Sequence, residues 1–341
     1  TAEKHMTLLA KDTIGVPPDD ILTVKNVAVS LTKGGRTMVS GVSFGVRRGE
    51  LFGIVGESGS GKTLFTLSLF GLHGETEISA GEITFDDKTL FEDGKRRRLG
   101  RILGCRIGFI PQDPYSSLNP SMRVGRQITE AIYLARGTPP NSRQCRDEAV
   151  ALLAEVGIPE PETAFRQYPD QFSGGMRQRI VIAIALSQDP ALLIADEPTT
   201  ALDAFTQRRI IDLIVERSRR RNLSVILISH NLELLRQSVD HIAVLYSGQL
   251  MNIFETADLG RNPLHPYTEA LFECIPSVNK TLTDIRSIPG EPAGAGFGLT
   301  GCAFADRCAY VQDICRTARL PENTGRADSF SACLLGKGVR T

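Results

Sequence analysis

The sequence predicts an α/β protein built on a mixed, mainly parallel sheet that helices cover on both faces. Short and wholly apolar runs such as "LFGIV", "ALLIAD" and "LSVILIS" are typical of strands buried on both faces. Segments with helical spacing alternate with these runs, which is the pattern of a sheet with helical crossovers. A glycine-rich loop also joins "LFGIV" to a helical segment. These three observations together favour a sheet that binds a ligand at its edge.

The alternating elements form one core, which we place at residues 21–256. It begins with the strands "ILTVKNVAVSL" and "VSFGV" and continues with the strand "LFGIV", the helix "KTLFTLSLFGL" and the strand "GEITFDD". After an interruption the alternation resumes at "RIVIAIALS" and ends with "HIAVLYSGQL". Residues 1–20 are polar and broken by "VPPDD", so we expect a flexible leader there.

Two further segments depart from the strand–helix alternation. Residues from about 115 to 172 have helical periodicity with Pro-rich breaks, and they predict a helical subdomain inserted into the core. Residues 257–341 are irregular, and four of the chain's seven cysteines fall near their end. We therefore expect a C-terminal extension with its own reason for containing cysteine.

Composition restricts the function classes. The chain has 39 basic and 39 acidic residues, so no net attraction to nucleic acid or anionic lipid is implied. No apolar stretch approaches the roughly 18 to 20 residues that cross a bilayer, and the first residues lack the plan of a signal peptide. We expect a cytoplasmic protein that reaches a membrane only through partners.

The loop "GESGSGKT" matches the phosphate-binding pattern in its strand–loop–helix setting. Its residues are Gly56, Glu57, Ser58, Gly59, Ser60, Gly61, Lys62 and Thr63. Backbone N–H groups of such a loop, and the positive end of the following helix, bind phosphate oxygens. Lys62 is expected to reach the β- and γ-phosphates, and Thr63 to ligate Mg²⁺. An incidental Gly/Ser turn is the alternative.

Two acidic residues end the strand "ALLIAD". Asp196 closes a buried strand, where an aspartate can hold Mg²⁺. Glu197 follows directly, in a place suited to polarising an attacking water as general base. The simpler alternative is an acidic turn after a strand. With the phosphate loop elsewhere in the chain, the pair favours nucleotide hydrolysis.

A second loop able to bind an anion lies in "QFSGGMRQR". Ser173, Gly174 and Gly175 open a helical run, and helix N-termini attract negative charge. One ATP does not need two such loops from one chain, so we expect each loop to serve a nucleotide held by a facing subunit. A serine-capped helix start is equally consistent with Ser173.

These motifs, in this order, resemble the ATP-binding subunits of ABC transporters. The resemblance also includes Gln112 in "FIPQDP", "ALD" ending at Asp203, and His230 in "ILISHN", and it covers roughly residues 21–335. It implies a P-loop NTPase core of the ABC ATPase type and an ATPase dimer whose seam contains Asp203. It further implies that Gln112 ligates Mg²⁺ and couples it to the helical insert, and that His230 contacts the γ-phosphate. Glu197, Lys62, Gln112 and His230 are then the catalytic set.

The sequence departs from that family at two places. The family usually has an aromatic residue before the phosphate loop to stack on adenine, yet none occurs between Asn26 and Val42. Arg36 or an aliphatic side chain is expected to replace it. Asn231 stands where the family usually has an acid, while the hydrolytic residues are all present.

Two more segments resemble the dipeptide and oligopeptide importers within the family. They are "FIPQDPYSSLNPSMRVGRQI" and "NPLHPYTEAL" followed by "SIPGEPA". We therefore predict an ATPase subunit of a peptide importer, with uptake of nickel or a metal chelate as the alternative in the same branch. A soluble ABC ATPase acting on nucleic acid or ribosomes is the alternative from another class. It would need a coiled-coil insertion or a second core, which this chain lacks.

The last cysteines are spaced Cys302-x5-Cys308-x6-Cys315-x17-Cys333. Four thiolates in an irregular, Gly-rich segment could gain order from a metal centre. Zinc usually takes tighter cysteine pairs, whereas iron–sulfur clusters accept varied spacings. Resemblance to cluster-containing peptide importers favours a four-iron, four-sulfur (4Fe–4S) cluster; zinc and no metal at all are the alternatives.

The partners follow from the resemblance. We expect a second ATPase subunit that is a paralogue, two transmembrane permease subunits, and an extracytoplasmic substrate-binding protein that acts through the permeases. The cofactors are then ATP with Mg²⁺ and the cluster, and no nucleic acid is bound. The place of action would be the cytoplasmic face of the inner membrane, as a peripheral subunit.

Overall fold

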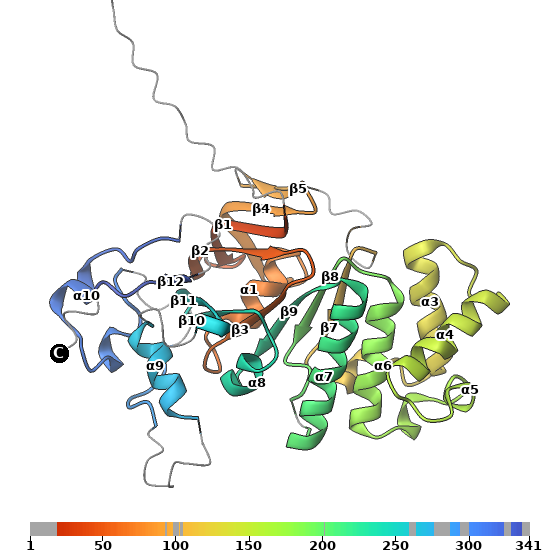
Figure 1. Cartoon of the computed structure of the whole chain (residues 1–341). Helices are drawn as coiled ribbons and strands as arrows, with labels where there is room; N and C mark the ends of the chain where they lie inside the picture. The colour runs from red at the N-terminus through yellow and green to blue at the C-terminus, as the bar shows by residue number, and fades with distance from the viewer. Residues whose placement is uncertain are drawn as a thin grey trace, which may run out of the picture.

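The described residues form two sheets and their covering helices, with the helical insert at one end and the C-terminal extension at the other (Figure 1). The computed structural model describes residues 19–92, 94–97, 102, 105–200, 202–258, 264–275, 287–293, 300–323 and 329–335. The leader predicted for residues 1–20 lies outside these ranges except for its last two residues, and Asp20 opens the first strand.

The larger sheet has seven strands in the order β12-β11-β10-β3-β9-β8-β7. Its strands are β3 (Leu51–Val55), β7 (Ile107–Ile110), β8 (Leu192–Asp196), β9 (Ser224–Ser229), β10 (His241–Tyr246), β11 (Gln249–Glu255) and β12 (Ser329–Ser331). Strands β10 to β7 are parallel, while β11 and β12 pair antiparallel at one edge. The α/β class and the mixed sheet are therefore confirmed. The C-terminal extension supplies the edge strand β12.

The smaller sheet is antiparallel and has the order β2-β1-β4-β5-β6. Its strands are β1 (Asp20–Leu31), β2 (Thr37–Arg47), β4 (Thr76–Phe85), β5 (Lys88–Glu92) and β6 (Lys95–Arg96). The sequence predicts strands within β1, β2 and β4 but not that they form a sheet of their own. Strand β1 pairs with β4, although β3 and the helix that follows it lie between them in the sequence. Pairing between such distant segments leaves no local sequence pattern.

The helices fall into three groups along the chain. Those of the core are α1 (Lys62–Leu69), α6 (Gly174–Ser187), α7 (Ala204–Arg221) and α8 (Leu232–Arg236). Those between residues 114 and 171 are α2 (Pro114–Ser117), α3 (Val124–Arg136), α4 (Arg143–Glu155), α5 (Pro161–Ala164) and η1 (Pro169–Gln171). Those after the core are η2 (Thr256–Asp258), α9 (Pro266–Glu273), η4 (Ala305–Arg307) and α10 (Asp313–Thr317).

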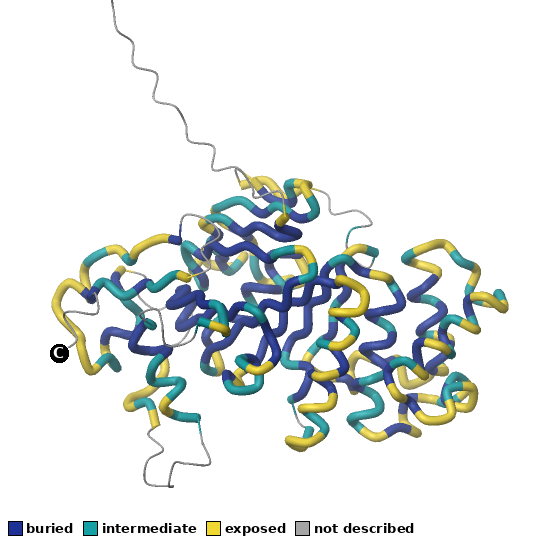
Figure 2. The backbone as a smooth tube through the Cα atoms, in the orientation of Figure 1, coloured by how far each residue is buried: buried dark blue, intermediate teal, exposed yellow. Residues whose placement is uncertain are grey.

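The larger sheet separates two apolar layers, because successive side chains of a strand point to opposite faces. On β8, Leu193 and Ala195 pack into the layer formed with the helices α3, α4, α6 and α7. Leu192 and Ile194 pack on the other side, with Phe65 of α1 and the smaller sheet. Figure 2 shows this buried centre running through the sheet. Burial on both faces explains why the core strands are wholly apolar.

This arrangement brings the carboxyl ends of the parallel strands to one edge of the sheet. The phosphate loop follows β3, Asp196 ends β8, and His230 follows β9. Open α/β sheets bind ligands at such an edge. Within the described ranges no helix is both long enough and apolar enough to cross a membrane.

Candidate functional site

The phosphate loop turns tightly between β3 and α1, and its glycines allow the turn. Gly59 and Gly61 have φ of 77° and 93°, which L-residues with side chains rarely adopt. A Cβ on Gly56 would lie 2.1 Å from the backbone oxygen of Leu245. Ser58 and Gly59 are exposed at the tip, whereas Ser60 is buried. The predicted residues 56–63 therefore form one loop, open at its tip and held at its base.

Lys62 lies across this loop. Its Nζ donates to the backbone oxygens of Gly56 (2.8 Å) and Glu57 (2.9 Å) and to Ser60 Oγ (3.3 Å). Burial lowers the pKa of Lys62, and the nearby carboxylate of Glu197 opposes that change. Lys62 is also the first residue of α1, so its ammonium group lies near a helix N-terminus, an arrangement suited to a polyphosphate.

Thr63 connects the phosphate loop to the end of β8. Its Oγ1 donates to Asp196 Oδ1 at 2.9 Å. Asp196 is 3% exposed, and burial raises its pKa although the Thr63 hydrogen bond opposes this. A buried carboxylate beside a hydroxyl is a donor set that Mg²⁺ accepts. Two of the three predicted protein ligands are therefore in contact, while Gln112 lies against Glu197.

Glu197 is the centre of a second group of side chains. Its Oε2 accepts hydrogen bonds from Gln112 Nε2 (3.3 Å) and Thr200 Oγ1 (3.0 Å) and lies 3.3 Å from His230 Nδ1. The sequence predicts three of these four residues for the same site, and the structure brings them together. Thr200 was not predicted, because a threonine in the turn "DEPTT" has no distinguishing pattern.

The backbone at Glu197 is strained, with φ of 43°. A non-glycine residue in this region costs of order 1 to 3 kcal/mol and persists where the surroundings require it. The Glu197 N–H donates to the backbone oxygen of Ile228 on the next strand (3.0 Å), which holds the turn in place. The strain aims the carboxylate at the edge of the sheet beside His230, whose side chain is 62% exposed.

Ser173, Gly174 and Gly175 lie apart from this group, at the start of α6. Ser173 is the N-cap, and its Oγ accepts from the Met176 N–H at 3.4 Å. Ser173 is exposed, and the two glycines are half-buried. Asp203 similarly caps α7, accepting from the Thr206 N–H at 3.0 Å, and is exposed. Both helix starts therefore face outward.

The C-terminal extension contacts the phosphate loop, which the sequence did not predict. Tyr267 Oη accepts from the Glu57 N–H at 2.9 Å. Arg307 donates from its two terminal nitrogens to the Glu57 carboxylate, at 2.7 and 3.2 Å. In the sequence, the "HPY" segment indicated only a resemblance to the peptide importers and gave no structural role for Tyr267.

The four late cysteines lie close together in the extension. The Cys302 N–H donates to the Cys315 oxygen at 2.7 Å, and Cys302 and Cys333 pack against the Cys315 cluster around Ala305. Burial raises the pKa of Cys302 to about 12, and the neighbouring Cys308 adds to this. None of the four forms a disulfide within the part of the chain that the structure describes. Within the described ranges, however, no three His, Cys, Asp or Glu side chains are spaced as metal ligands.

Comparison with known proteins identifies relatives of both parts of the chain. Residues 39–200 match the family described as ABC transporter, and residues 251–315 match the oligopeptide/dipeptide transporter C-terminal region. The dipeptide transport ATP-binding protein DppD of Bacillus subtilis is 41% identical over 317 residues, covering 92% of this chain and 93% of that protein. The oligopeptide transport ATP-binding protein OppD of Salmonella typhimurium is 37% identical, covering 89% and 90%.

Solved structures show the same fold. The protein cbiO1 of Clostridium perfringens, part of the ABC transporter complex cbiONQ, matches with a TM-score of 0.62 and 25% identity, covering 72% of this chain and 92% of that one. The ATP-binding cassette MJ0796, in a dimeric post-hydrolysis state with ADP and Pi, matches with a TM-score of 0.59 and 26% identity. That match covers 69% of this chain and 98% of the other.

Proposed function

This chain belongs to the ATP-binding subunits of ABC transporters, and on that premise we propose that its ATP hydrolysis powers an importer of di- and oligopeptides. The observation that carries the proposal is the grouping of Gln112, Glu197 and His230. The three residues come from distant segments of the chain. A protein that only bound the nucleotide would not require their convergence.

The roles of the site residues follow from their surroundings. Residues 56–63 hold the phosphates of ATP, with Lys62 on the β- and γ-phosphates. Thr63, Asp196 and Gln112 would hold Mg²⁺, which supplies charge neutralisation on the phosphate oxygens when bound.

Hydrolysis depends on the carboxylate that ends the core strand. Glu197 accepts a proton from the attacking water and orients that water for in-line attack. His230 approaches the same carboxylate from the end of β9, so it can report the state of the γ-phosphate to the next helix. Thr200 donates to the same Oε2 and fixes the rotamer of Glu197.

A second ATPase subunit completes the site. Ser173 and the following glycines present an exposed helix N-terminus that binds anions. We assign this loop to ATP held by the facing subunit, and Asp203 to the seam between the two subunits. A paralogue is the expected partner, as in the importer branch that the sequence resembles.

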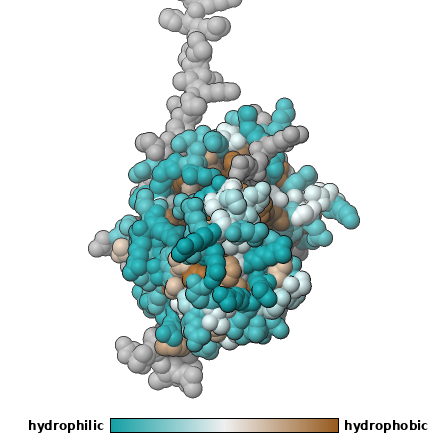
Figure 3. Space-filling model, turned by 90° about the vertical axis from the view of Figure 1, so that its right-hand side faces the viewer, coloured by the Kyte–Doolittle hydropathy of each residue, from teal (hydrophilic) through white to brown (hydrophobic). Residues whose placement is uncertain are grey.

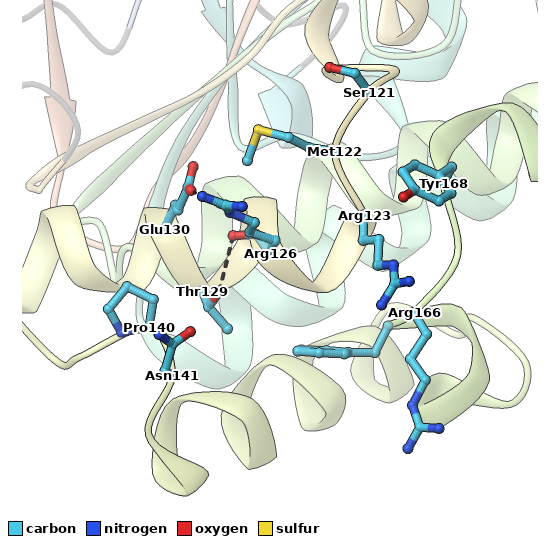
Figure 4. Close-up of a pocket in the computed structure, with 11 residues that line it drawn as sticks. Ser121, Met122, Arg123, Arg126, Thr129, Glu130, Pro140, Asn141, Arg166 and Tyr168 are labelled. Atoms are coloured by element: carbon cyan, nitrogen blue, oxygen red, sulfur yellow. Dashed lines mark hydrogen bonds and ion pairs between the residues drawn. The ribbon is translucent and has the colours of Figure 1, made fainter.

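The helical insert is the proposed docking surface for the permease subunits. A cavity of about 610 Å³ opens there between the segment entering α3, the turn before α4 and the segment after α5 (Figure 4). Arg123, Arg126, Glu130 and Tyr168 line it together with Met122. This side of the molecule is largely hydrophilic with small apolar spots (Figure 3), which suits a polar cytoplasmic segment of a membrane protein. Binding there would place the chain on the cytoplasmic face of the membrane.

The peptide cargo rests on the C-terminal region and on the relatives. Those relatives are named for dipeptide or oligopeptide transport, which favours peptides over nickel or a metal chelate. The cargo would reach the permeases from an extracytoplasmic binding protein.

Transport by the assembled complex in liposomes tests the proposal: ATP-dependent uptake of labelled di- and oligopeptides is expected. A complex that hydrolyses ATP but takes up only nickel would contradict it.

We also propose that Cys302, Cys308, Cys315 and Cys333 hold a 4Fe–4S cluster. The proximity of Cys308, Cys315 and Cys333 to Cys302 supports this, although the described side chains are not spaced as ligands. Four cysteines are the usual ligand set of such a cluster. Anaerobic purification should give a brown protein with iron and acid-labile sulfide near four each per chain, as four thiolate ligands suggest. A colourless, iron-free protein would exclude the cluster, and stoichiometric zinc would replace it.

A further inference from the structure

Two side chains of the C-terminal extension end on a single residue of the phosphate loop. Tyr267, on α9, accepts the backbone N–H of Glu57, and Arg307, in η4, forms a two-pronged ion pair with its carboxylate. They lie 210 and 250 residues from Glu57 along the chain. The extension therefore holds both the backbone and the side chain of the second residue of the loop.

These contacts are built into a packed and largely dry environment. The side chain of Arg307 is 6% exposed and that of Glu57 is 23% exposed, and Tyr267 is fully buried. The ring of Tyr267 packs on Tyr246 and Phe304 at centroid distances of 4.6 and 5.2 Å. Planar, charge-assisted pairs of this kind fix geometry as well as adding energy.

Further contacts hold the guanidinium of Arg307 in place. Its Nη1 also donates to Tyr246 Oη at 3.2 Å, and its Nε donates to the backbone oxygen of Pro289 at 2.8 Å. These contacts keep Arg307 on the Glu57 carboxylate. The carboxylate remains close enough to influence Lys62 electrostatically.

Without Arg307, the Glu57 carboxylate would have two effects on a bound polyphosphate. It would place an unneutralised negative charge beside the phosphates, which repels them in a partly buried site. It would also be free to pair with the ammonium of Lys62, whose Nζ already lies 2.9 Å from the Glu57 backbone oxygen. Both effects would weaken ATP binding while leaving Glu197 and His230 in place.

The same two segments continue to the four late cysteines. Arg307 directly precedes Cys308, and His265, two residues before Tyr267, has its Nε2 3.5 Å from Cys302 Sγ. The "HPY" segment thus spans from a cysteine thiol to the phosphate loop. This gives a physical role to a motif that the sequence alone marks only by resemblance.

We propose that Tyr267 and Arg307 are positioning residues for ATP, through which the C-terminal extension fixes the phosphate loop and keeps Glu57 away from Lys62. The inference rests on the proposed ATP site at residues 56–63. It makes the extension part of the nucleotide site and not merely an attached module.

The test compares KM for ATP with kcat, using the full chain in its assembled transporter. Arg307→Met should raise KM about tenfold, as expected for losing one charge-assisted hydrogen bond, with kcat little changed. Arg307→Lys should recover part of the loss, because it restores the charge but not the two-pronged geometry. Tyr267→Phe removes only the hydroxyl and should raise KM about threefold.

A double variant separates positioning from folding. Glu57→Gln with Arg307→Met removes the freed carboxylate, so KM should return toward the wild-type value. A merely structural role would give no such rescue. Arg316→Met is the matched control, because Arg316 lies in the same extension and contacts only Asp306 at the surface among the ion pairs of the described residues; its KM should be unchanged.

Three results would overturn the inference. They are an unchanged KM in Arg307→Met, a loss of kcat alone, or a double variant no better than the single one. Lys62→Ala distinguishes this failure from that of the ATP site itself. If Lys62→Ala abolishes ATP binding while Arg307→Met has no effect, only the positioning role fails; if Lys62→Ala binds ATP normally, the site assignment fails first.

Discussion

The two anion-binding loops of this chain differ in how far the chain itself completes them. In the phosphate loop, Lys62 is 4% exposed and hydrogen-bonded to the loop, and Glu57 is held from the extension. In the loop at α6, Ser173 is exposed and its side chain makes a long capping contact to its own helix. The contacts of the phosphate loop are all supplied by this chain, whereas the loop at α6 lies at the surface.

The body of α6 shows that this openness is not a sign of weak structure. Ile180, Ile182 and Leu186 are 0 to 2% exposed in the main core. Only the first turn of the helix lies at the surface. An anchored helix with an exposed N-terminus is suited to bind an anion rigidly, as the proposed role toward a facing subunit requires.

The largest expected effect on ATP turnover lies beside the phosphate loop, at the proposed general base. Glu197→Gln keeps the shape of the side chain but removes the base, so ATP turnover by the assembled complex should fall by about a hundredfold or more. ATP binding should persist. Glu216→Gln on α7, an exposed carboxylate paired with Arg220, is the matched control. Equal turnover in Glu197→Gln would remove Glu197 from its assigned role.

The variant Ser173→Asp tests the exposed loop at the start of α6. Aspartate keeps the N-cap acceptor but places a negative charge toward the ATP of a facing subunit. Turnover of the complex should fall at least about tenfold, as when one stabilising group of a reacting oxyanion is lost. ATP affinity of the isolated chain should not change.

Ser173→Asn provides the control for that experiment. Asparagine also caps helices and is close to aspartate in size, but it carries no charge. Turnover should therefore fall much less in Ser173→Asn than in Ser173→Asp. Wild-type turnover in Ser173→Asp would show that no phosphate approaches this loop. The proposed role of the loop toward a facing subunit would then be wrong.

A smaller effect is expected at Thr200. Thr200→Val preserves the shape of the side chain and removes the hydrogen bond to Glu197, so kcat should fall about fivefold as the carboxylate loses one orienting partner. KM for ATP should stay constant. Thr317→Val removes a comparable hydroxyl in α10 that bonds only its own helix and should have no effect. A change in KM with constant kcat would place Thr200 in binding instead.

The smallest expected effect is on the stability of the protein, through the ion pairs of Asp86 near the smaller sheet. Asp86 joins Arg48 (2.8 Å) and Arg106 (2.7 Å), which tie the smaller sheet to the strands that flank the site. Burial acts to raise the pKa of Asp86, but the two arginines outweigh it, so the pKa lies below its ordinary value of 3.8. The stabilisation is therefore present above 3.8 and is lost as the pH falls through the lower folded value.

Asp86→Asn should destabilise the protein by about 1 kcal/mol or less at neutral pH, because both arginines are more than a third exposed. The difference from wild type should shrink below pH 3.8. Urea unfolding at several pH values measures it. Asp87→Asn, whose carboxylate is 76% exposed, should change stability less. A difference that grows in acid would show that Asp86 is not held ionised by its partners.

Local chemistry in the sequence was enough to predict much of the site. The glycines of the phosphate loop and the apolar strand before Asp196 are readable from neighbours in the chain, whereas Gln112 and His230 were assigned to the site by resemblance to ABC transporter subunits. Asn231, a departure from the related proteins, still caps α8 by accepting from the Leu234 N–H at 3.0 Å. Caps and tight turns need only a few adjacent residues, so they appear in the sequence directly.

The sequence by itself determined most of the core strands and the phosphate loop, because both depend on local residue types, and the resemblance to ABC transporter subunits added Gln112 and His230 to the candidate site. Only the tertiary structure decided that the first strands form a separate sheet, that Thr200 joins Glu197, and that Tyr267 and Arg307 hold Glu57. Those contacts require segments up to 250 residues apart to meet. Their geometry follows from the packing of the whole chain, which leaves no periodic trace in any one segment.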